Sequence, residues 1–152
     1  MAQTCQVRRE GVRDVLAGRP ATEKTTRTLD EALVALTSLP GSPAAARVRL
    51  DEQAEIELDL NYETSELQKD LLYLRQGEEQ FESDLAARHP GHTAQVEAGV
   101  ALIRETELRN FVSDRDGTVN NYCGRYLSSV QALYNAVFLT RFARRRTANA
   151  VV

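Results

Sequence analysis

Cysteine is scarce in this chain, and so are the features of a secreted or membrane protein. The two cysteines, Cys5 and Cys123, lie far apart and have no metal-binding spacing. This usage argues against a disulfide framework and against a cysteine metal site. No apolar run approaches membrane-spanning length, and the N-terminus lacks the apolar core of a signal peptide. The sequence therefore predicts a cytoplasmic protein with no membrane partner.

An excess of positive charge is also absent. Acidic residues number 22 and basic residues 19, and the formal net charge is −3, which argues against a general nucleic-acid-binding protein. The hydrophobic fraction of 42% is enough for a packed core, and 152 residues suit about one domain. We therefore expect a folded, mostly helical chain with no nucleic-acid partner.

Composition divides the chain into three regions. Residues 1–27 are polar and predict partial disorder or one short helix around Val12–Leu16. Residues 28–107 predict helices, and residues 108–152 predict the start of an α/β domain. The first region also carries basic residues that are typical of a frayed polar terminus: Arg8, Arg9 and Arg13.

Helix start and stop signals predict the first helix of the second region. Residues 28–31, Thr-Leu-Asp-Glu, have the pattern of a capping box, and the helix that they open ends at Pro40 and Gly41. Ser42 followed by Pro43 is typical of another helix start.

Residues 46–60 allow two interpretations. Apolar residues alternate with charged ones, as in a strand, but helix-forming residues dominate and neither Gly nor Pro occurs. We favour a helix and retain, as the alternative, a hairpin that turns at Asp51–Gln53.

Apolar stripes predict two further helices. The first is long and amphipathic and ends before Pro90 and Gly91, and Thr93 then caps the second. We favour packing of these helices on the C-terminal domain over the alternative, a helical arm that forms a homo-oligomer or covers a site. The stripes contain Leu67, Leu71, Leu74, Phe81 and Leu85, then Val96, Val100 and Ile103.

The run Phe111–Thr118 is the part of the sequence that indicates chemistry. A short apolar run is followed by Asp-Arg-Asp-Gly-Thr, which is typical of a buried strand that ends in a tight turn. Because residues two apart on a strand share a face, Asp114 and Asp116 can converge on one point. Two carboxylates there suit a hard cation such as Mg²⁺, or a nucleophile beside an acid/base. Gly117 permits the sharp turn, and the Thr118 hydroxyl can hydrogen-bond to the carboxylates.

This pattern resembles motif I of the haloacid dehalogenase phosphohydrolase superfamily, Asp-x-Asp-Gly-Thr after a hydrophobic strand. The resemblance implies that Asp114 attacks phosphorus and that Asp116 protonates the leaving oxygen and later activates water. It implies Mg²⁺ held by Asp114 and by the backbone carbonyl of Asp116. The implied fold class is α/β: an N-terminal helical region, then the first strand–flap–helix–strand unit of a Rossmann-like haloacid dehalogenase domain, truncated.

The last residues predict the second strand of that unit. Residues 147–152 read as the first half of a buried strand. A strand–turn–helix–strand order needs a right-handed crossover, so we expect residues 148–152 to lie parallel to Phe111–Asp114. The resemblance implies three further motifs after Val152. We therefore expect an N-terminal fragment of a longer protein, inactive as a phosphatase alone.

The segment after motif I bears on the substrate. It is too short for a large inserted cap before the next helix, which Ser128 or Ser129 caps. A cap inserted later is typical of the branch with trehalose-phosphate and related sugar-phosphate phosphatases, which we favour. The Asp-Arg-Asp-Gly-Thr sequence also resembles that of an alternative branch, the capless histidinol-phosphate and heptose-bisphosphate phosphatases. Candidate substrate contacts, which loop solvation explains equally well, are Thr118, Asn120, Asn121, Tyr122 and Arg125.

These observations predict that the complete protein is a magnesium-dependent phosphatase acting on a sugar phosphate or similar small phosphate ester. Two alternatives stay open. One is a non-catalytic helical interaction module formed by residues 28–107. The other is a phosphotransferase or mutase that uses Asp114 but passes the phosphoryl group to a second substrate.

Overall fold

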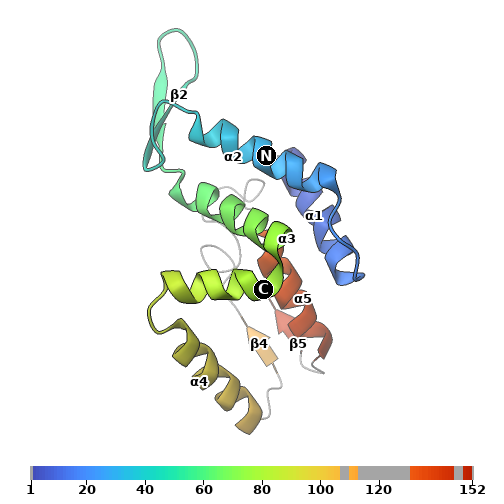
Figure 1. Cartoon of the computed structure of the whole chain (residues 1–152). Coiled ribbons are helices and arrows are strands. Elements are labelled where there is room, and N and C mark those ends of the chain that lie inside the picture. Colours follow the sequence, from blue (N-terminus) through green and yellow to red (C-terminus); the bar gives the residue numbers. More distant parts are fainter. Residues whose placement is uncertain (1, 107–109, 113–130, 146–148, 152) are drawn as a thin grey trace.

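The computed structural model describes residues 2–106, 110–112, 131–145 and 149–151. Helices dominate, and a small antiparallel hairpin and helix α4 lie at opposite ends of the molecule (Figure 1). The elements are α1 (Ala2–Leu16), α2 (Glu23–Thr37), β1 (Gly41–Ser42), β2 (Ala45–Arg49), β3 (Glu55–Leu58), α3 (Asn61–Arg88), α4 (His92–Glu105), β4 (Asn110–Val112), α5 (Leu133–Arg145) and β5 (Asn149–Val151). Among the described residues, no helix is both long and apolar enough to cross a membrane.

The N-terminal region is helical, which corrects the expectation of partial disorder; the alternative, one short helix around Val12–Leu16, lies inside a longer helix. Helix α1 covers Ala2–Leu16, and α2 begins at Glu23, before the predicted capping box. The Thr22 side chain caps α2 by accepting the Thr25 N–H. Thr28 lies in the second turn and is buried rather than capping. The polar composition was misleading because α1 and α2 bury only a narrow face and leave the rest in water.

A hydrophobic cluster joins the first three helices. Val7 of α1, Leu29 of α2, and Leu67 and Leu71 of α3 are each less than 5% exposed and pack together. These residues come from three separate sequence segments, so the cluster fixes how α1 and α2 lie against α3 (Figure 1). Burial of such side chains stabilises the fold by about 1.5–3 kcal/mol each.

The hairpin alternative for residues 46–60 is confirmed, and the favoured helix is wrong. Strand β2 pairs antiparallel with β3, with Val48 opposite Ile56, and β1 adds a third strand. The Asp51 carboxylate accepts the N–H groups of Gln53 and Ala54, which closes the turn. This local turn and the alternating pattern outweigh helix propensity. Ser42 pairs with Ala45 in the sheet and does not start a helix.

The long helix predicted from the Leu67–Leu85 stripe is two helical segments that meet at Gly77. Gly77 has φ 82° and ψ 179°, a region that is essentially accessible only to glycine. The segments form an angle in Figure 1, where the second half of α3 turns away from the first. The predicted end before Pro90 is confirmed. The next helix starts after Gly91, in the left-handed region at φ 86°, and not at Thr93.

A second hydrophobic cluster places α5 on this bent helix. Tyr73 and Phe81 come from the two sides of the Gly77 bend, and they pack with Leu133 and Val137 of α5. The Tyr73 and Phe81 rings meet edge to face with centroids 5.6 Å apart, a favoured aromatic geometry. The bend therefore brings both halves of α3 against one helix.

The parallel strand pair predicted from the sequence is confirmed where the structure describes it. Strand β4 pairs parallel with β5, with Phe111 opposite Ala150. Helix α5 lies between them in the chain, which gives a β–α–β order. The predicted strand residue Asp114 lies outside the described residues. The described chain is thus a mostly helical N-terminal region with a three-stranded sheet, followed by a β–α–β unit.

We predict that Gly77→Ala destabilises the chain by about 1–3 kcal/mol, because an alanine cannot hold this backbone conformation without strain. Gly99→Ala in α4 is the matched control. Nothing lies within 4 Å of the added methyl there, so better helix propensity should stabilise it by about 0.5–1 kcal/mol. Denaturant unfolding of both variants measures the difference, and shifts of the same sign would contradict the role of the bend.

Candidate active site

Every site residue predicted from the sequence lies outside the described residues. Asp114, Asp116, Thr118, Asn120, Asn121 and Arg125 all fall between Val112 and Gln131. The structure does describe the elements on either side of this segment. They are strand β4, which ends at Val112, and helix α5, which begins at Leu133.

The β–α–β order defines one edge of the parallel pair. Strands β4 and β5 run in the same direction, so their carboxyl ends share an edge. Helix α5 must run back between them, so it begins near that edge and ends near the other. In parallel sheets, ligands bind outside the carboxyl ends of the strands. Asp114 follows the end of β4 by two residues in the sequence, which makes this edge the candidate active site.

A buried carboxylate fixes the start of α5. Asp70 of α3 is fully buried. Its Oδ1 accepts the N–H groups of Leu133 at 2.7 Å and Tyr134 at 3.3 Å, the first two residues of α5. A helix start leaves N–H groups without intrahelical partners and carries partial positive charge. Asp70 therefore acts as a helix cap supplied by a different helix.

The other oxygen of this carboxylate binds α1. Asp70 Oδ2 accepts a hydrogen bond from Arg8 Nε at 2.6 Å. Burial raises the pKa of the Asp70 carboxyl above its usual value, and the Arg8 charge, its hydrogen bond and the two N–H groups of α5 all act against that rise. One buried side chain of α3 thus joins α1 and α5 through a single set of polar contacts.

Tyr134 adds a second polar link between α3 and α5. Its hydroxyl donates to Glu66 Oε2 at 2.8 Å, and Lys69 pairs with Glu66 and lies over the Tyr134 ring. Burial, followed by the Glu66 charge, raises the pKa of Tyr134 above its usual value. The phenol therefore stays protonated and remains the donor to Glu66.

Helices α1 and α5 approach each other closely at Gly11. A methyl group at Gly11 would lie 2.6 Å from Leu133 Cδ1 and 3.1 Å from Thr25 Cγ2, so only a glycine fits without a shift. Leu133 is fully buried and has little room to move. A cavity lies beside this contact, and Val12 of α1 and Ala136 of α5 are among its lining residues.

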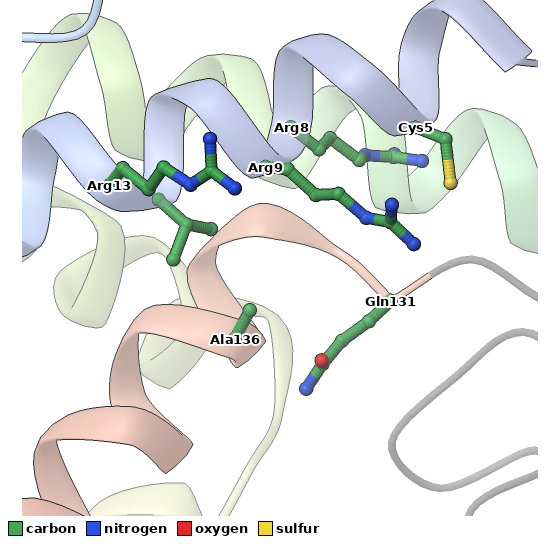
Figure 2. A pocket seen from close by; sticks show the side chains of 7 residues that line it. Cys5, Arg8, Arg9, Arg13, Gln131 and Ala136 are labelled. Carbon is green, nitrogen blue, oxygen red and sulfur yellow. The ribbon is translucent and has the colours of Figure 1, made fainter.

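This cavity, of about 390 Å³, lies between α1 and the start of α5. Three arginines project into it from α1, and Gln131 and Ala136 line the α5 side (Figure 2). Among the described residues, no group of three or more metal-ligating side chains could hold a metal ion. The full lining is Cys5, Arg8, Arg9, Val12, Arg13, Gln131 and Ala136.

Sequence reasoning missed the polar residues that hold α5. Arg8 was interpreted as part of a frayed terminus, and Asp70 was not singled out. One signal was available, because Asp70 sits between Leu67 and Leu71 on the apolar stripe of α3. A carboxylate in such a stripe is rarely buried without a partner. Its partners lie 62 and 63 residues away, so no local pattern could name them.

Comparison with known proteins places these two parts in one protein family. Residues 1–89 match the trehalose-6-phosphate phosphatase N-terminal helical bundle domain, and residues 111–152 match the C-terminal part of trehalose-6-phosphate phosphatase. The chain belongs to the trehalose-6-phosphate phosphatase family. The boundary between the matches falls in α4 and the residues before β4.

The individual relatives carry two names, trehalose-phosphate synthase and trehalose-phosphatase. The chain is 32% identical to alpha,alpha-trehalose-phosphate synthase [UDP-forming] 1 of Caenorhabditis briggsae over 95% of its length, which is 13% of that relative. It is 29% identical to alpha,alpha-trehalose-phosphate synthase [UDP-forming] 2 of Caenorhabditis elegans over 100% of its length, 14% of the relative. A trehalose-phosphatase of Brugia malayi is 48% identical over 22% of the chain and 7% of the relative. The chain thus spans about an eighth of the length of the synthases.

We predict that Asp70→Asn destabilises the chain by about 3–5 kcal/mol, because it leaves the buried Arg8 charge without its partner. Asp30→Asn is the control, since the side chains of the Asp30–Arg75 pair are 46% and 50% exposed and such pairs contribute about 0–1 kcal/mol. Denaturant unfolding measures both. Hydrogen exchange of the Leu133 amide should also accelerate in Asp70→Asn alone. Equal effects of the two variants would show that Asp70 does not hold α5.

Proposed function

We propose that the complete protein is a magnesium-dependent phosphatase that hydrolyses a sugar phosphate, with trehalose 6-phosphate as the candidate substrate. The observation that carries the proposal is the match of residues 111–152 to the C-terminal part of trehalose-6-phosphate phosphatase. That stretch contains the whole Asp-Arg-Asp-Gly-Thr run. The parallel β4–β5 pair supports it, because a strand ending just before Asp114 is the setting that the motif needs.

The chemistry follows from two carboxylates in different protonation states. Asp114, ionised, attacks phosphorus, and the bond from phosphorus to the ester oxygen breaks as Asp116 gives its proton to that oxygen. The product is an aspartyl-phosphate on Asp114. Asp116, now ionised, takes a proton from water as the water oxygen attacks phosphorus, and inorganic phosphate and the Asp114 carboxylate are released. The reaction therefore needs Asp116 to change protonation state twice per cycle.

The donor set suits Mg²⁺. Carboxylate and carbonyl oxygens are the ligands this hard cation prefers, and Asp114 and the Asp116 carbonyl would supply them. When bound, Mg²⁺ offsets repulsion between the Asp114 carboxylate and the anionic phosphate. Candidate contacts to the substrate remain Thr118, Asn120, Asn121 and Arg125.

The names of the relatives that match most of the chain favour a second candidate function. Those that match at least 95% of the chain are UDP-forming trehalose-phosphate synthases, which is the reason to test synthesis of a sugar phosphate from a UDP-sugar. We favour the phosphatase for this part of the protein, because both matching family models describe trehalose-6-phosphate phosphatase. If an Asp114→Asn variant still released UDP, the synthase activity would belong to residues other than Asp114.

We predict that Asp116→Asn lowers kcat of the complete protein by about 100-fold to 10,000-fold, the usual contribution of a general acid–base group. Asp114→Asn keeps the size of the side chain but removes the nucleophilic charge, so the loss should be at least as large. Steady-state phosphate release from trehalose 6-phosphate measures the turnover of both variants. In a second assay, enzyme quenched with acid during turnover of labelled substrate should carry labelled phosphate only when Asp114 is present. The exposed Asp30→Asn variant is the control. Near-wild-type turnover by Asp114→Asn would overturn the nucleophile assignment.

A further inference from the structure

We propose that the cavity between α1 and the start of α5 binds the phosphate group of a small molecule through Arg9 and Arg13. The cavity is lined by Arg8, Arg9 and Arg13 and by Gln131, with no carboxylate among its described lining residues. Its volume of about 390 Å³ is in the range of small-molecule sites. Asp114 and Asp116 are not among its described lining residues, and the proposed binding needs neither a nucleophile nor Mg²⁺.

The spacing of the arginines places them on one face of α1. Arg9 and Arg13 are four residues apart in the helix, so they are neighbours on its surface. Two like charges at this spacing destabilise a helix by about 0.2–0.5 kcal/mol when nothing neutralises them. Figure 2 shows the Arg9 side chain extending from α1 toward Gln131, while the Arg13 side chain lies along α1, and both line the cavity. A dianion between the two guanidinium groups would remove this repulsion.

The nearby carboxylates of α1 are paired with other cations. Glu10 lies within 4.0 Å of Lys24, and Asp14 pairs with Arg19 at 2.6 Å. Asp70 accepts Arg8. Among the described residues, Arg9 and Arg13 form no ion pair. Asp70 therefore compensates the charge of Arg8, and the uncompensated positive charge of the cavity comes from Arg9 and Arg13.

Arginine and glutamine side chains suit a phosphate group. Each guanidinium presents a fork of N–H donors that matches two phosphate oxygens, and these charge-assisted hydrogen bonds are stronger than neutral ones. Gln131 can add an amide N–H donor from the opposite wall. Arg8 is held by Asp70 through Nε, so its position in the wall is fixed. The donors thus come from α1 and from Gln131, which lies two residues before α5, and Gly11 allows α1 and α5 to approach each other closely.

The phosphate could belong to a sugar phosphate or be free inorganic phosphate, and the experiment separates the two. The purified 152-residue chain, with divalent cations chelated, is titrated with inorganic phosphate, glucose 6-phosphate and glucose. Calorimetry measures binding, and alkylation of Cys5 by iodoacetamide, read by peptide mass spectrometry, reports occupancy because Cys5 lines the cavity. The alkylation rate should fall by the factor 1 + [L]/Kd with both phosphates and stay unchanged with glucose.

Variants assign the effect to named residues. Arg9→Gln and Arg13→Gln should each weaken phosphate binding about tenfold, and the double variant should abolish protection of Cys5. Arg104→Gln is the matched control, because Arg104 is exposed on α4 and does not line the cavity. An Asp114→Asn/Asp116→Asn variant should bind phosphate like the wild type, which separates this proposal from the proposed function.

Three results would each overturn the proposal. The first is protection of Cys5 by chloride at matched ionic strength, which would indicate general screening. The second is unchanged binding in the Arg9→Gln/Arg13→Gln double variant. The third is loss of binding in the Asp114→Asn/Asp116→Asn variant, which would place the phosphate at the predicted catalytic carboxylates. A stronger effect of glucose 6-phosphate than of inorganic phosphate would identify an esterified ligand, and the reverse order would identify free phosphate.

Discussion

The buried carboxylate of Asp70 is the interaction on which the arrangement of the helices depends. It lies on α3, binds Arg8 of α1 through one oxygen and accepts the first N–H groups of α5 through the other. Removing a carboxylate from water costs several kcal/mol unless its partners are present. The cost is offset only when α1, α3 and α5 are all in place, so the contact favours their assembly as one unit.

This dependence makes the N-terminal helices part of the support for the candidate active site. Helix α5 is the crossover between β4 and β5, so its position determines where the carboxyl edge of that pair lies. Asp70 fixes the first turn of α5, and the Gly77 bend lets Tyr73 and Phe81 pack on its first two turns. The described parts of the two regions are therefore joined by a polar contact at the start of α5 and by apolar packing on its first two turns.

The sequence predicted those features that local patterns encode. The apolar stripe of α3, the strand at Phe111 and the parallel pairing of the last strand are confirmed within the described residues. The helix at residues 46–60 was wrong because propensity was weighed above the turn that Asp51 closes. Only the end of α1, around Val12–Leu16, was predicted as a helix, and only as one of two alternatives, because the packing partners of Val7 lie in α2 and α3, farther along the chain. The catalytic pair Asp114 and Asp116 stays a prediction.

Helix α1 shows how one element can serve both regions. Successive helical residues point about 100° apart, so Arg8 reaches the buried Asp70 while Arg9, the next residue, turns to the cavity. The N–H groups of Leu133 and Tyr134 are already taken by Asp70, so the start of α5 adds little free positive potential of its own. The positive charge of the cavity therefore comes from α1. Asp70, which caps α5, also holds α1 in place through Arg8. A ligand bound by the arginines of α1 would therefore be coupled to the Arg8–Asp70 contact.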